Sequence, residues 1–519
     1  MIQMPIYFKT IFAFLILIFS INHSYADNTN DSIWISPNNY NAYLYYQNIG
    51  NTDYSHLILY GQSLSMGWQS PQIITPTALS GNYMVGTLPL IYDSNSSPTS
   101  LNPLIAVKWS QGGEEPIVGL TNEFSYLYRN YTGKNQLFIG SNAGEGGTSI
   151  ERLSKESING INYYSTKFLK LLNSTKSIVN RLNKTVSCPA IIFMQGESNY
   201  INTEGSGLTG NTDATTEKDK YKQYLSTLKN NMQADIMNIY QQTRKPLFFI
   251  YEVAGRCIYR LDMSINMAQV EFAQENDDVF LLNPTYFTPD YNGVHLSTNG
   301  SRWYGEMIAK SLYNVFVNKI DFTPVFPHTF EINNNSIKIG FYVQQLPLVF
   351  DHNIKETIAN EGFEVRMNGQ NVPISDIAIE GNYVIITCSK KLVETIEIVY
   401  AGINTSGSGN LRDSDSYTSL YTYYNDSSAT LIENYTPVNS YGNKIYNEPY
   451  PMYNWCSNFY KKMIIPIISD LDVIQNKSQV VNYYDLQGRI VNMPLPKGLY
   501  IEKRVDDNGK ISFTKFLKH

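Results

Sequence analysis

Cysteine is scarce in this sequence, with four residues in a chain of 519. The four lie far apart and form no paired motif of the kind that binds zinc or carries redox chemistry. They do not make a disulfide scaffold in a chain of this length, even if the protein is exported. We therefore expect buried free thiols and predict neither a metal site nor a cofactor. The cysteines are Cys188, Cys257, Cys388 and Cys456.

Charge and long apolar runs are limited as well. Charged residues make up 16% of the chain, the formal net charge is -6, and no long basic run occurs. Nucleic acid is therefore not an expected partner. After residue 26 no apolar stretch is long enough to cross a bilayer, so the sequence predicts no transmembrane segment in the mature chain.

The first 26 residues have the pattern of an export signal. Lys9 precedes a short apolar core at residues 11–21, and Ser24-Tyr25-Ala26 forms a small-x-small cleavage site. We predict a signal peptide at residues 1–26 that is cleaved on export, and hence a secreted or cell-surface protein. The alternative is a retained N-terminal anchor.

Strand-like and helical patterns alternate through the first 320 residues. Short apolar runs typical of buried strands include residues 137–140, 190–194, 247–253 and 279–282. Amphipathic helical patterns occupy residues 161–182 and 221–240, and Ser297 is placed to cap a further helix. Repeated strand and helix units predict an α/β fold, with a parallel sheet covered by helices as a three-layer sandwich.

Beyond Phe322 the pattern changes to short alternating segments separated by Asn and Gly turns, which predicts a β-sandwich module. Because 519 residues exceed one ordinary core, several domains are expected. The predicted units are an α/β domain at 27–320, the β-sandwich module at 321–430, a linker region at 431–474 and a small β domain at 475–519.

Four short polar segments stand out in the α/β region, and three of them follow predicted strands. They are Gly61-Gln62-Ser63, Gly146-Gly147-Thr148-Ser149, Gln195-Gly196-Glu197-Ser198 and Gly293-Val294-His295-Leu296-Ser297. A serine just after a parallel strand lies in the crevice where open α/β sheets bind ligands. In this order, the segments resemble the motifs of SGNH-type hydrolases, most closely the sialate O-acetylesterase and acetylxylan esterase group. The resemblance covers about residues 54–318 and implies a flavodoxin-like fold.

Acyl transfer needs a nucleophile, a base that takes its proton, and donors for the oxyanion. Ser63 is the candidate nucleophile, and His295 is the candidate base because imidazole exchanges a proton near neutral pH. The resemblance implies an oxyanion hole made of the Ser63 N–H, the Gly146 N–H and the side-chain amide of Gln195. The alternative for Gln195 is a turn-capping amide. We expect Glu197 to order its loop.

One position departs from the family pattern. SGNH-type hydrolases usually have an aspartate three residues before the histidine, and this chain has Asn292 there. Asn292 could orient the imidazole without charge, Asp290 could reach it instead, or a backbone carbonyl could suffice in a Ser-His dyad. Replacing a triad aspartate by a neutral residue can lower turnover about ten-thousand-fold, so loss of activity is one expectation.

The C-terminal residues resemble a different family. Tyr484-Asp485-Leu486-Gln487-Gly488-Arg489, Lys497-Gly498-Leu499-Tyr500-Ile501 and Lys515-Phe516-Leu517-Lys518 are similar to the C-terminal sorting domain of the Bacteroidota type IX secretion system. The resemblance implies that the secretion machinery is a partner of this tail. The alternative is a terminal hairpin of the preceding β-domain.

The leading functional hypothesis is a secreted carbohydrate O-acetylesterase that removes acetyl groups from sialic acid or another acetylated glycan. An acetylated carbohydrate is then the expected partner. Two alternatives remain at this stage. One is a lipid or aryl esterase with the same machinery, and the other is a degenerate hydrolase that serves as a glycan-binding surface protein.

Overall fold

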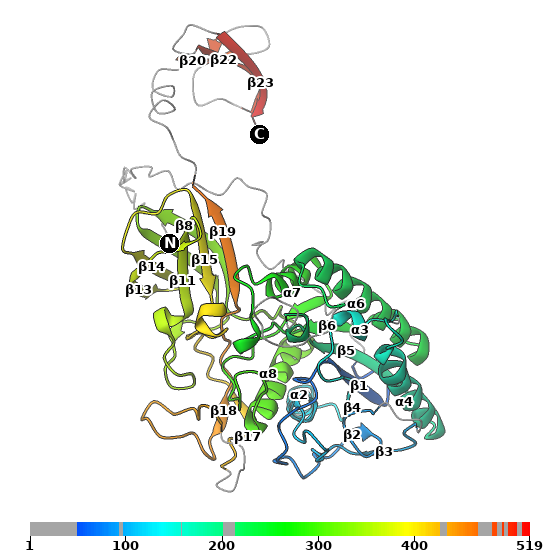
Figure 1. The fold of residues 1–519 in the computed structure, drawn as a ribbon. Helices are drawn as coiled ribbons and strands as arrows, with labels where there is room; N and C mark the ends of the chain where they lie inside the picture. The colour runs from blue at the N-terminus through cyan, green and yellow to red at the C-terminus, as the bar shows by residue number, and fades with distance from the viewer. Residues whose placement is uncertain are drawn as a thin grey trace, which may run out of the picture. The chain divides into compact units, whose positions relative to one another are not determined.

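The computed structural model describes residues 49–92, 97–156, 158–200, 213–425, 433–465, 480–484, 490–491, 497–505 and 511–518 (Figure 1). The predicted signal peptide lies outside these residues, as do residues 485–489 of the C-terminal motif. The described residues form two compact units. The larger unit runs to residue 461 without the short segments 367–369 and 393–396, and the smaller unit holds those two segments and the C-terminal residues.

A seven-stranded sheet organises the first part of the larger unit. Its strand order is β3-β2-β4-β1-β5-β6-β7, and every neighbouring pair is parallel except β2 and β3. All eight residues of the central strand β1 are buried, as expected for a parallel sheet covered on both faces. The strands are β1 (Tyr54–Gly61), β2 (Asn82–Val85), β3 (Leu101–Pro103), β4 (Leu137–Asn142), β5 (Val186–Met194), β6 (Leu247–Ile250) and β7 (Val279–Leu281).

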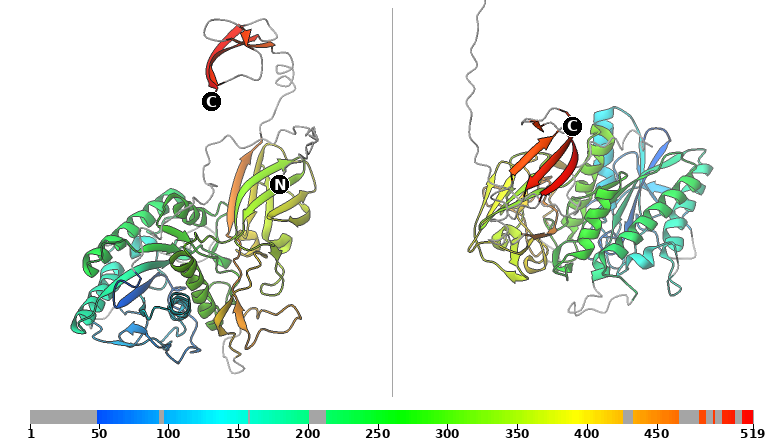
Figure 2. Two further views of the ribbon diagram at one scale, coloured as in Figure 1. Left: turned by 180° about the vertical axis from the view of Figure 1, so that it is seen from behind. Right: turned by 90° about the horizontal axis from the view of Figure 1, so that it is seen from above.

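Helices cover both faces of this sheet (Figures 1 and 2). Helices α2 and α8 pack closely against each other, and α6 packs against α4 and α7. The arrangement confirms the predicted α/β class with a largely parallel sheet. Ser297 caps α8 as predicted, because its Oγ accepts a hydrogen bond from the Gly300 N–H at 3.0 Å. The helices are α2 (Pro116–Thr132), α3 (Ile150–Leu153), α4 (Lys170–Arg181), α5 (Glu197–Tyr200), α6 (Lys218–Tyr240), α7 (Ser264–Glu275) and α8 (Thr298–Tyr313).

Antiparallel β-sheets follow the α/β part. One four-stranded sheet has the order β13-β14-β9-β8 and another the order β12-β11-β15-β19. Phe459 joins the two sheets, since its ring lies against Phe330 and Phe341 of the first sheet and Phe363 and Tyr400 of the second. The strands are β8 (Phe326–Asn333), β9 (Ser336–Tyr342), β11 (Phe363–Met367), β12 (Gln370–Asn371), β13 (Ile374–Glu380), β14 (Tyr383–Cys388), β15 (Thr395–Tyr400) and β19 (Phe459–Ile464).

Phe459 lies in the segment 431–474, for which the sequence predicts a linker. The structure instead places β18 (Pro449–Pro451) and β19 in this segment. The strand β19 has the alternating burial of a sandwich strand, with Phe459, Lys461 and Met463 facing inward. The sequence signal is weak because only six alternating residues stand within a polar, Asn-rich stretch. Residues 433–465 are therefore part of the folded unit and not a connection.

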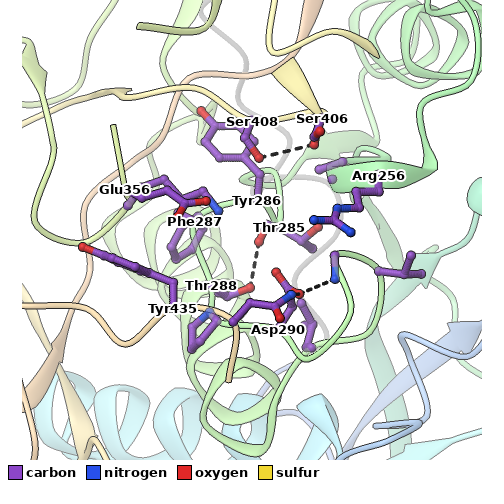
Figure 3. A pocket seen from close by; sticks show the side chains of 18 of the residues that line it. Arg256, Thr285, Tyr286, Phe287, Thr288, Asp290, Glu356, Ser406, Ser408 and Tyr435 are labelled. Atoms are coloured by element: carbon purple, nitrogen blue, oxygen red, sulfur yellow. Dashed lines mark hydrogen bonds between the residues drawn. The ribbon is translucent and has the colours of Figure 1, made fainter. Parts of the chain in front are cut away.

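A cavity of about 370 Å³ borders the loop that connects β7 to α8 (Figure 3). The loop contributes Asp290, Gly293 and Val294 to the lining of the cavity. Glu356 and Tyr435, from the region of antiparallel sheets, line it as well. Arg256, which follows β6, also lines it. Neither Ser63 nor His295 lines this cavity among the described residues.

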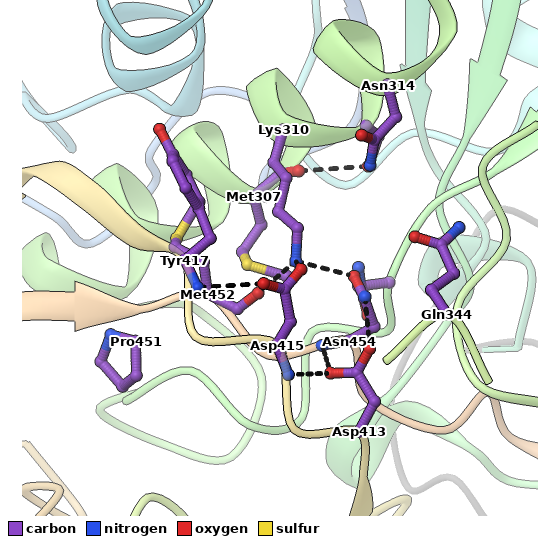
Figure 4. Close-up of polar contacts among 12 residues, drawn as sticks. Met307, Lys310, Asn314, Gln344, Asp413, Asp415, Tyr417, Pro451, Met452 and Asn454 are labelled. Atoms are coloured by element: carbon purple, nitrogen blue, oxygen red, sulfur yellow. Dashed lines mark hydrogen bonds and ion pairs between the residues drawn. The ribbon is translucent and has the colours of Figure 1, made fainter. Parts of the chain in front are cut away.

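A buried lysine ties the β part to α8 (Figure 4). Lys310 Nζ lies 2.7 Å from Asp415 Oδ2 and donates to Asn454 Oδ1 at 3.1 Å and to the Met452 carbonyl. Asn454 in turn donates its Nδ2 hydrogen to Asp413 at 2.6 Å. Burial lowers the pKa of Lys310, and Asp415 and Asp413 act in the opposite direction. Residues from two later segments of the chain are thereby fixed on the last helix of the α/β part.

The smaller unit contains an antiparallel sheet with the order β21-β20-β22-β23. This is the predicted small β tail; a role in sorting stays a prediction. Within the described part of the chain, no helix is long and apolar enough to cross a membrane. All four cysteines are buried and unpaired. The strands are β20 (Val480–Tyr484), β21 (Ile490–Val491), β22 (Gly498–Val505) and β23 (Ile511–Lys518).

We expect Lys310→Met to lower the free energy of unfolding by about 3 kcal/mol, because it removes the buried cation that faces the partly buried Asp415 and the buried Asp413. The measurement is chemical denaturation of the variant beside the parent. Lys184→Met is the matched control, since Lys184 pairs with Asp53 at the surface and its loss is expected to matter far less. Equal effects of the two substitutions would contradict the assigned role of Lys310.

Candidate active site

Ser63 lies in a tight turn directly after the central strand. Strand β1 ends at Gly61, where a Cβ atom would lie 1.9 Å from the Met194 carbonyl oxygen of β5. Only glycine allows this approach of the two strands. The turn closes through the Ser63 carbonyl, which accepts the N–H groups of Met66 at 3.1 Å and Trp68 at 3.2 Å. The serine is thereby held at the carboxyl end of a parallel strand, where its prediction as a nucleophile requires it.

His295 reaches Ser63 from the loop between β7 and α8. Its Nε2 atom lies 3.0 Å from Ser63 Oγ, although the two residues are 232 positions apart. Backbone bonds hold the loop, since the Tyr291 N–H donates to the His295 carbonyl at 3.2 Å and the Ser297 N–H to the Pro289 carbonyl at 2.9 Å. Burial lowers the pKa of His295 to about 4. The predicted nucleophile and base are therefore within hydrogen-bonding distance, with the imidazole neutral near pH 7.

Asn292 contacts the imidazole, and its orientation is fixed. The Asn292 Oδ1 atom accepts the backbone N–H groups of Val294 at 3.0 Å and His295 at 2.8 Å. Because an N–H group can only donate, the oxygen must face these two groups. The Nδ2 atom therefore faces His295 Nδ1 at 3.4 Å and donates to Gln69 Oε1 at 2.9 Å.

This orientation favours one imidazole tautomer. Since Asn292 Nδ2 can only donate, the Nδ1 atom that faces it acts as the acceptor. The ring proton of neutral His295 then lies on Nε2 and is directed at Ser63 Oγ. A general base needs its lone pair at that position, and an aspartate that accepts the Nδ1 proton would provide it. Asn292 therefore orients the ring but stabilises the tautomer that cannot take the serine proton.

Asp290 does not replace the missing aspartate. Its Oδ1 atom accepts the Gly293 N–H and the Nδ2 hydrogen of Asn434, the latter at 2.7 Å. In the part of the chain that the structure describes, no carboxylate or backbone carbonyl bonds to Nδ1 of His295. The sequence leaves three partners open for the imidazole: Asn292, Asp290 and a backbone carbonyl. Of these, the structure places Asn292 beside Nδ1.

Two of the three predicted oxyanion donors are available. Within the described residues, the N–H groups of Ser63 and Gly146 donate to no protein oxygen. The Glu145 N–H donates to the Gly61 carbonyl at 2.9 Å, which fixes the glycine turn beside the end of β1. Two unpaired N–H groups next to a nucleophile are the arrangement that stabilises a tetrahedral oxyanion.

The third predicted donor, Gln195, is occupied. Its side chain is fully buried, and its Nε2 atom donates to Thr148 O at 3.2 Å and Asn199 Oδ1 at 2.7 Å. Its Oε1 atom accepts from the Tyr221 hydroxyl at 2.8 Å. Both amide hydrogens are bonded inside the protein, so Gln195 has none for an oxyanion. The arrangement matches the alternative of a turn-capping amide, since one acceptor, Asn199, lies four residues further along the same turn and the other, Thr148, lies in the glycine turn.

Gln62 and Glu197 hold the same turn. The Gln62 Oε1 atom accepts the N–H groups of Gly196 at 3.2 Å and Ser198 at 3.0 Å. The Glu197 carboxyl accepts the Tyr251 hydroxyl, and burial raises its pKa to about 7. Gln62 joins the nucleophile turn to the 195–198 turn, a role that sequence reasoning missed although Gln62 directly precedes Ser63.

Aromatic side chains border the nucleophile turn. The backbone N–H of Trp68 donates to the Ser63 carbonyl. The Trp68 ring lies 3.5 Å from the place that a Cβ atom on Gly146 would occupy. Trp109 lies 5.7 Å from the Trp68 ring, and Tyr92, 39% exposed, lies 6.3 Å from the Trp109 ring. Sequence reasoning missed this cluster because its members are far apart in a stretch without periodic pattern.

No family model and no curated protein matches the sequence. Among solved structures, a carbohydrate acetylesterase from Xanthomonas citri has 13% identity and a TM-score of 0.43 over 78% of this chain and 80% of that one. A protein from Arabidopsis thaliana has 14% identity and a TM-score of 0.36 over 51% and 99%. An acetyl xylan esterase variant from Geobacillus stearothermophilus has 9% identity and a TM-score of 0.26 over 52% and 96%. These likenesses are distant, and the chemistry of this chain rests on its own geometry.

We expect Asn292→Asp to raise ester hydrolysis, by as much as about ten-thousand-fold if the full effect of a triad carboxylate is gained. The carboxylate would keep the acceptor for the Val294 and His295 N–H groups and accept the Nδ1 proton with its other oxygen. The measurement is kcat for a chromogenic acetate ester. Asn292→Ala, which removes both atoms, is the control, and an Asp variant no faster than the parent would contradict the tautomer argument.

The pH profile provides a second check on His295. A base acts only when it is neutral, and the pKa near 4 keeps the imidazole neutral in moderately acidic solution. For the parent, kcat/KM is expected to fall only as the pH drops through about 4. In Asn292→Asp the adjacent negative charge favours the imidazolium, so the fall is expected at higher pH. An acid limb at the same pH in both proteins would contradict this account.

Proposed function

We propose that this chain is a carbohydrate O-acetylesterase that acts on acetylated glycans outside the cell. The observation that carries the proposal is the 3.0 Å contact between Ser63 Oγ and His295 Nε2, next to the unpaired N–H groups of Ser63 and Gly146. A hydroxyl, an imidazole and two oxyanion donors are the groups that acyl transfer needs.

In the proposed reaction, His295 acts in the tautomer that carries its proton on Nδ1, which Asn292 disfavours but does not block. Ser63 Oγ attacks the acetyl carbonyl, and Nε2 of this tautomer takes the serine proton. The oxyanion is held by the N–H groups of Ser63 and Gly146. His295 then gives the proton to the departing sugar oxygen, which leaves an acetyl-serine. A water molecule, deprotonated by His295, hydrolyses this ester and releases acetate.

A sugar ester is supported as the substrate class by the accessible rings of Trp68, which borders the nucleophile turn, and Tyr92, both of which pack on the buried Trp109. Aromatic faces provide large, rigid apolar area for sugar rings. The position of the Trp68 ring next to Gly146 also limits the space beside the oxyanion donors, which favours acetyl over longer acyl groups. Sialic acid and acetylated xylan are the two substrates that the sequence resemblance favours.

A second candidate is a glycan-binding protein without hydrolytic activity. The orientation of Asn292 favours it, because the amide stabilises the imidazole tautomer that cannot act as a base. In both cases we propose export through residues 1–26 and sorting through the C-terminal β-sheet, which is supported by the sequence motifs of these segments.

The deciding experiment is acetate release from O-acetylated sialic acid and from acetylated xylan by the purified protein. We expect release by the parent, and none above the blank by Ser63→Ala. Ser65→Ala is the matched control, since Ser65 lies in the same turn but its hydroxyl donates to the Gln62 carbonyl at 2.6 Å. Release that persists in Ser63→Ala would overturn the proposed nucleophile. No release from either substrate, with sugar binding retained in Ser63→Ala, would support the binding protein.

A further inference from the structure

The residue that departs from the triad pattern is followed by glycine. An asparagine side chain is attacked by the backbone nitrogen of the next residue most readily when that residue is glycine, which has no side chain to block the approach. Asn292 is exposed, and Gly293 has φ +79°. A Cβ at Gly293 would lie 2.4 Å from Arg256 Cδ, so any other residue here would displace the Arg256 side chain.

Three groups that would assist such an attack contact this pair. Asp290 Oδ1 accepts the Gly293 N–H, which places a base on the attacking nitrogen. The N–H groups of Val294 and His295 hold Asn292 Oδ1 at 3.0 and 2.8 Å, so negative charge that develops on this oxygen is stabilised. The imidazole of His295 lies 3.4 Å from Nδ2, the nitrogen that would leave.

Gly293 also lies beside the positively charged side chain of Arg256 and at the edge of the cavity described above. The Arg256 side chain packs over Gly293, and a positive charge beside an N–H group favours its deprotonation. The cavity of about 370 Å³ is lined by Asp290, Gly293 and Val294 and gives room for water on this side of the loop (Figure 3).

We propose that Asn292 is a self-modification site, at which deamidation converts the amide to a carboxylate and completes a triad with Ser63 and His295. This inference rests on the proposed esterase function for its consequence, but not for the modification itself. The observation behind it is the joint placement of Asp290, two N–H donors and His295 around an exposed Asn-Gly pair.

The chemistry is balanced without an added reactant other than water. The Gly293 nitrogen forms a bond to Asn292 Cγ and gives its proton to Asp290. The bond from Cγ to Nδ2 breaks, and the nitrogen takes up one proton and leaves as ammonia. Water then adds to the side-chain carbonyl of the cyclic imide and reopens its bond to the Gly293 nitrogen, which produces the carboxylate. The net change is one water consumed and one ammonia released.

The conversion would reverse the tautomer of His295. One carboxylate oxygen keeps the bonds from the N–H groups of Val294 and His295, and the other stands where Nδ2 stood. An acceptor at that place holds the imidazole proton on Nδ1, so Nε2 presents its lone pair to Ser63 Oγ. The backbone need not change, but the Gln69 amide must turn its Nε2 toward the new oxygen, because Gln69 Oε1 now accepts from Nδ2 at 2.9 Å.

The test is peptide mapping by mass spectrometry of freshly purified protein during incubation at mildly alkaline pH. The chain contains two internal comparison sites, the exposed pairs Asn159-Gly160 and Asn368-Gly369, which lack the Asp290 contact and whose asparagines, unlike Asn292, have a left-handed backbone. We expect the mass increase of deamidation several-fold faster at Asn292 than at either control. Asp290→Asn is expected to slow it at Asn292 alone.

Acetate release by the same samples separates the two proposals. It should rise in step with the converted fraction in the parent, while Asn292→Asp starts at the high level and does not rise. Conversion at Asn292 no faster than at Asn159 and Asn368 would overturn the self-modification, whatever the activity. Selective conversion without acetate release by either protein would overturn the esterase function and leave the modification supported. Conversion to isoaspartate alone would overturn the completed triad.

Discussion

The close approach of β1 and β5 at Gly61 is the constraint on which the active site depends. A side chain at this position would collide with the Met194 carbonyl, so the strands meet only because the residue is glycine. The approach sets where β1 ends and where the Ser63 turn begins. The Gly61 carbonyl also receives the Glu145 N–H, which brings the glycine turn with Gly146 to the same place. The two contacts of Gly61 thus bring the Ser63 turn and the glycine turn, which hold the predicted nucleophile and oxyanion donors, to the same end of β1.

The α/β fold could be predicted from the sequence because its signals are local. Buried strands of a parallel sheet appear as continuous apolar runs, and α6 shows its apolar face over more than six turns of periodic sequence. The pairing of Ser63 with His295 could be predicted from ordered motifs alone. Strand β19 could not, because its short alternating segment lies in a polar stretch and gains its stability from Phe459 packing between two sheets formed by other segments.

The roles of the amide side chains were beyond sequence reasoning for a related reason. An amide offers two hydrogens and an oxygen, and what it does depends on which acceptors surround it. Gln195 was predicted to face the oxyanion, but Thr148 and Asn199 bond both of its hydrogens. Asn292 is one of the three groups that the sequence leaves open for orienting the imidazole, and it faces the ring with its donor side because two backbone N–H groups bind its oxygen. In both cases the deciding partners are set by the local fold, through backbone and side-chain groups for Gln195 and through backbone N–H groups for Asn292.

The loop before α8 meets two requirements with different atoms of one side chain. The turn needs an acceptor for the Val294 and His295 N–H groups, and Oδ1 provides it whether the side chain is an amide or a carboxylate. The chemistry depends on the other atom, which faces His295 Nδ1. Stability of the loop and basicity of the imidazole are therefore separable at this position. An exchange of the second atom would change the tautomer and the contact with Gln69, while the two backbone bonds that hold the loop would stay in place.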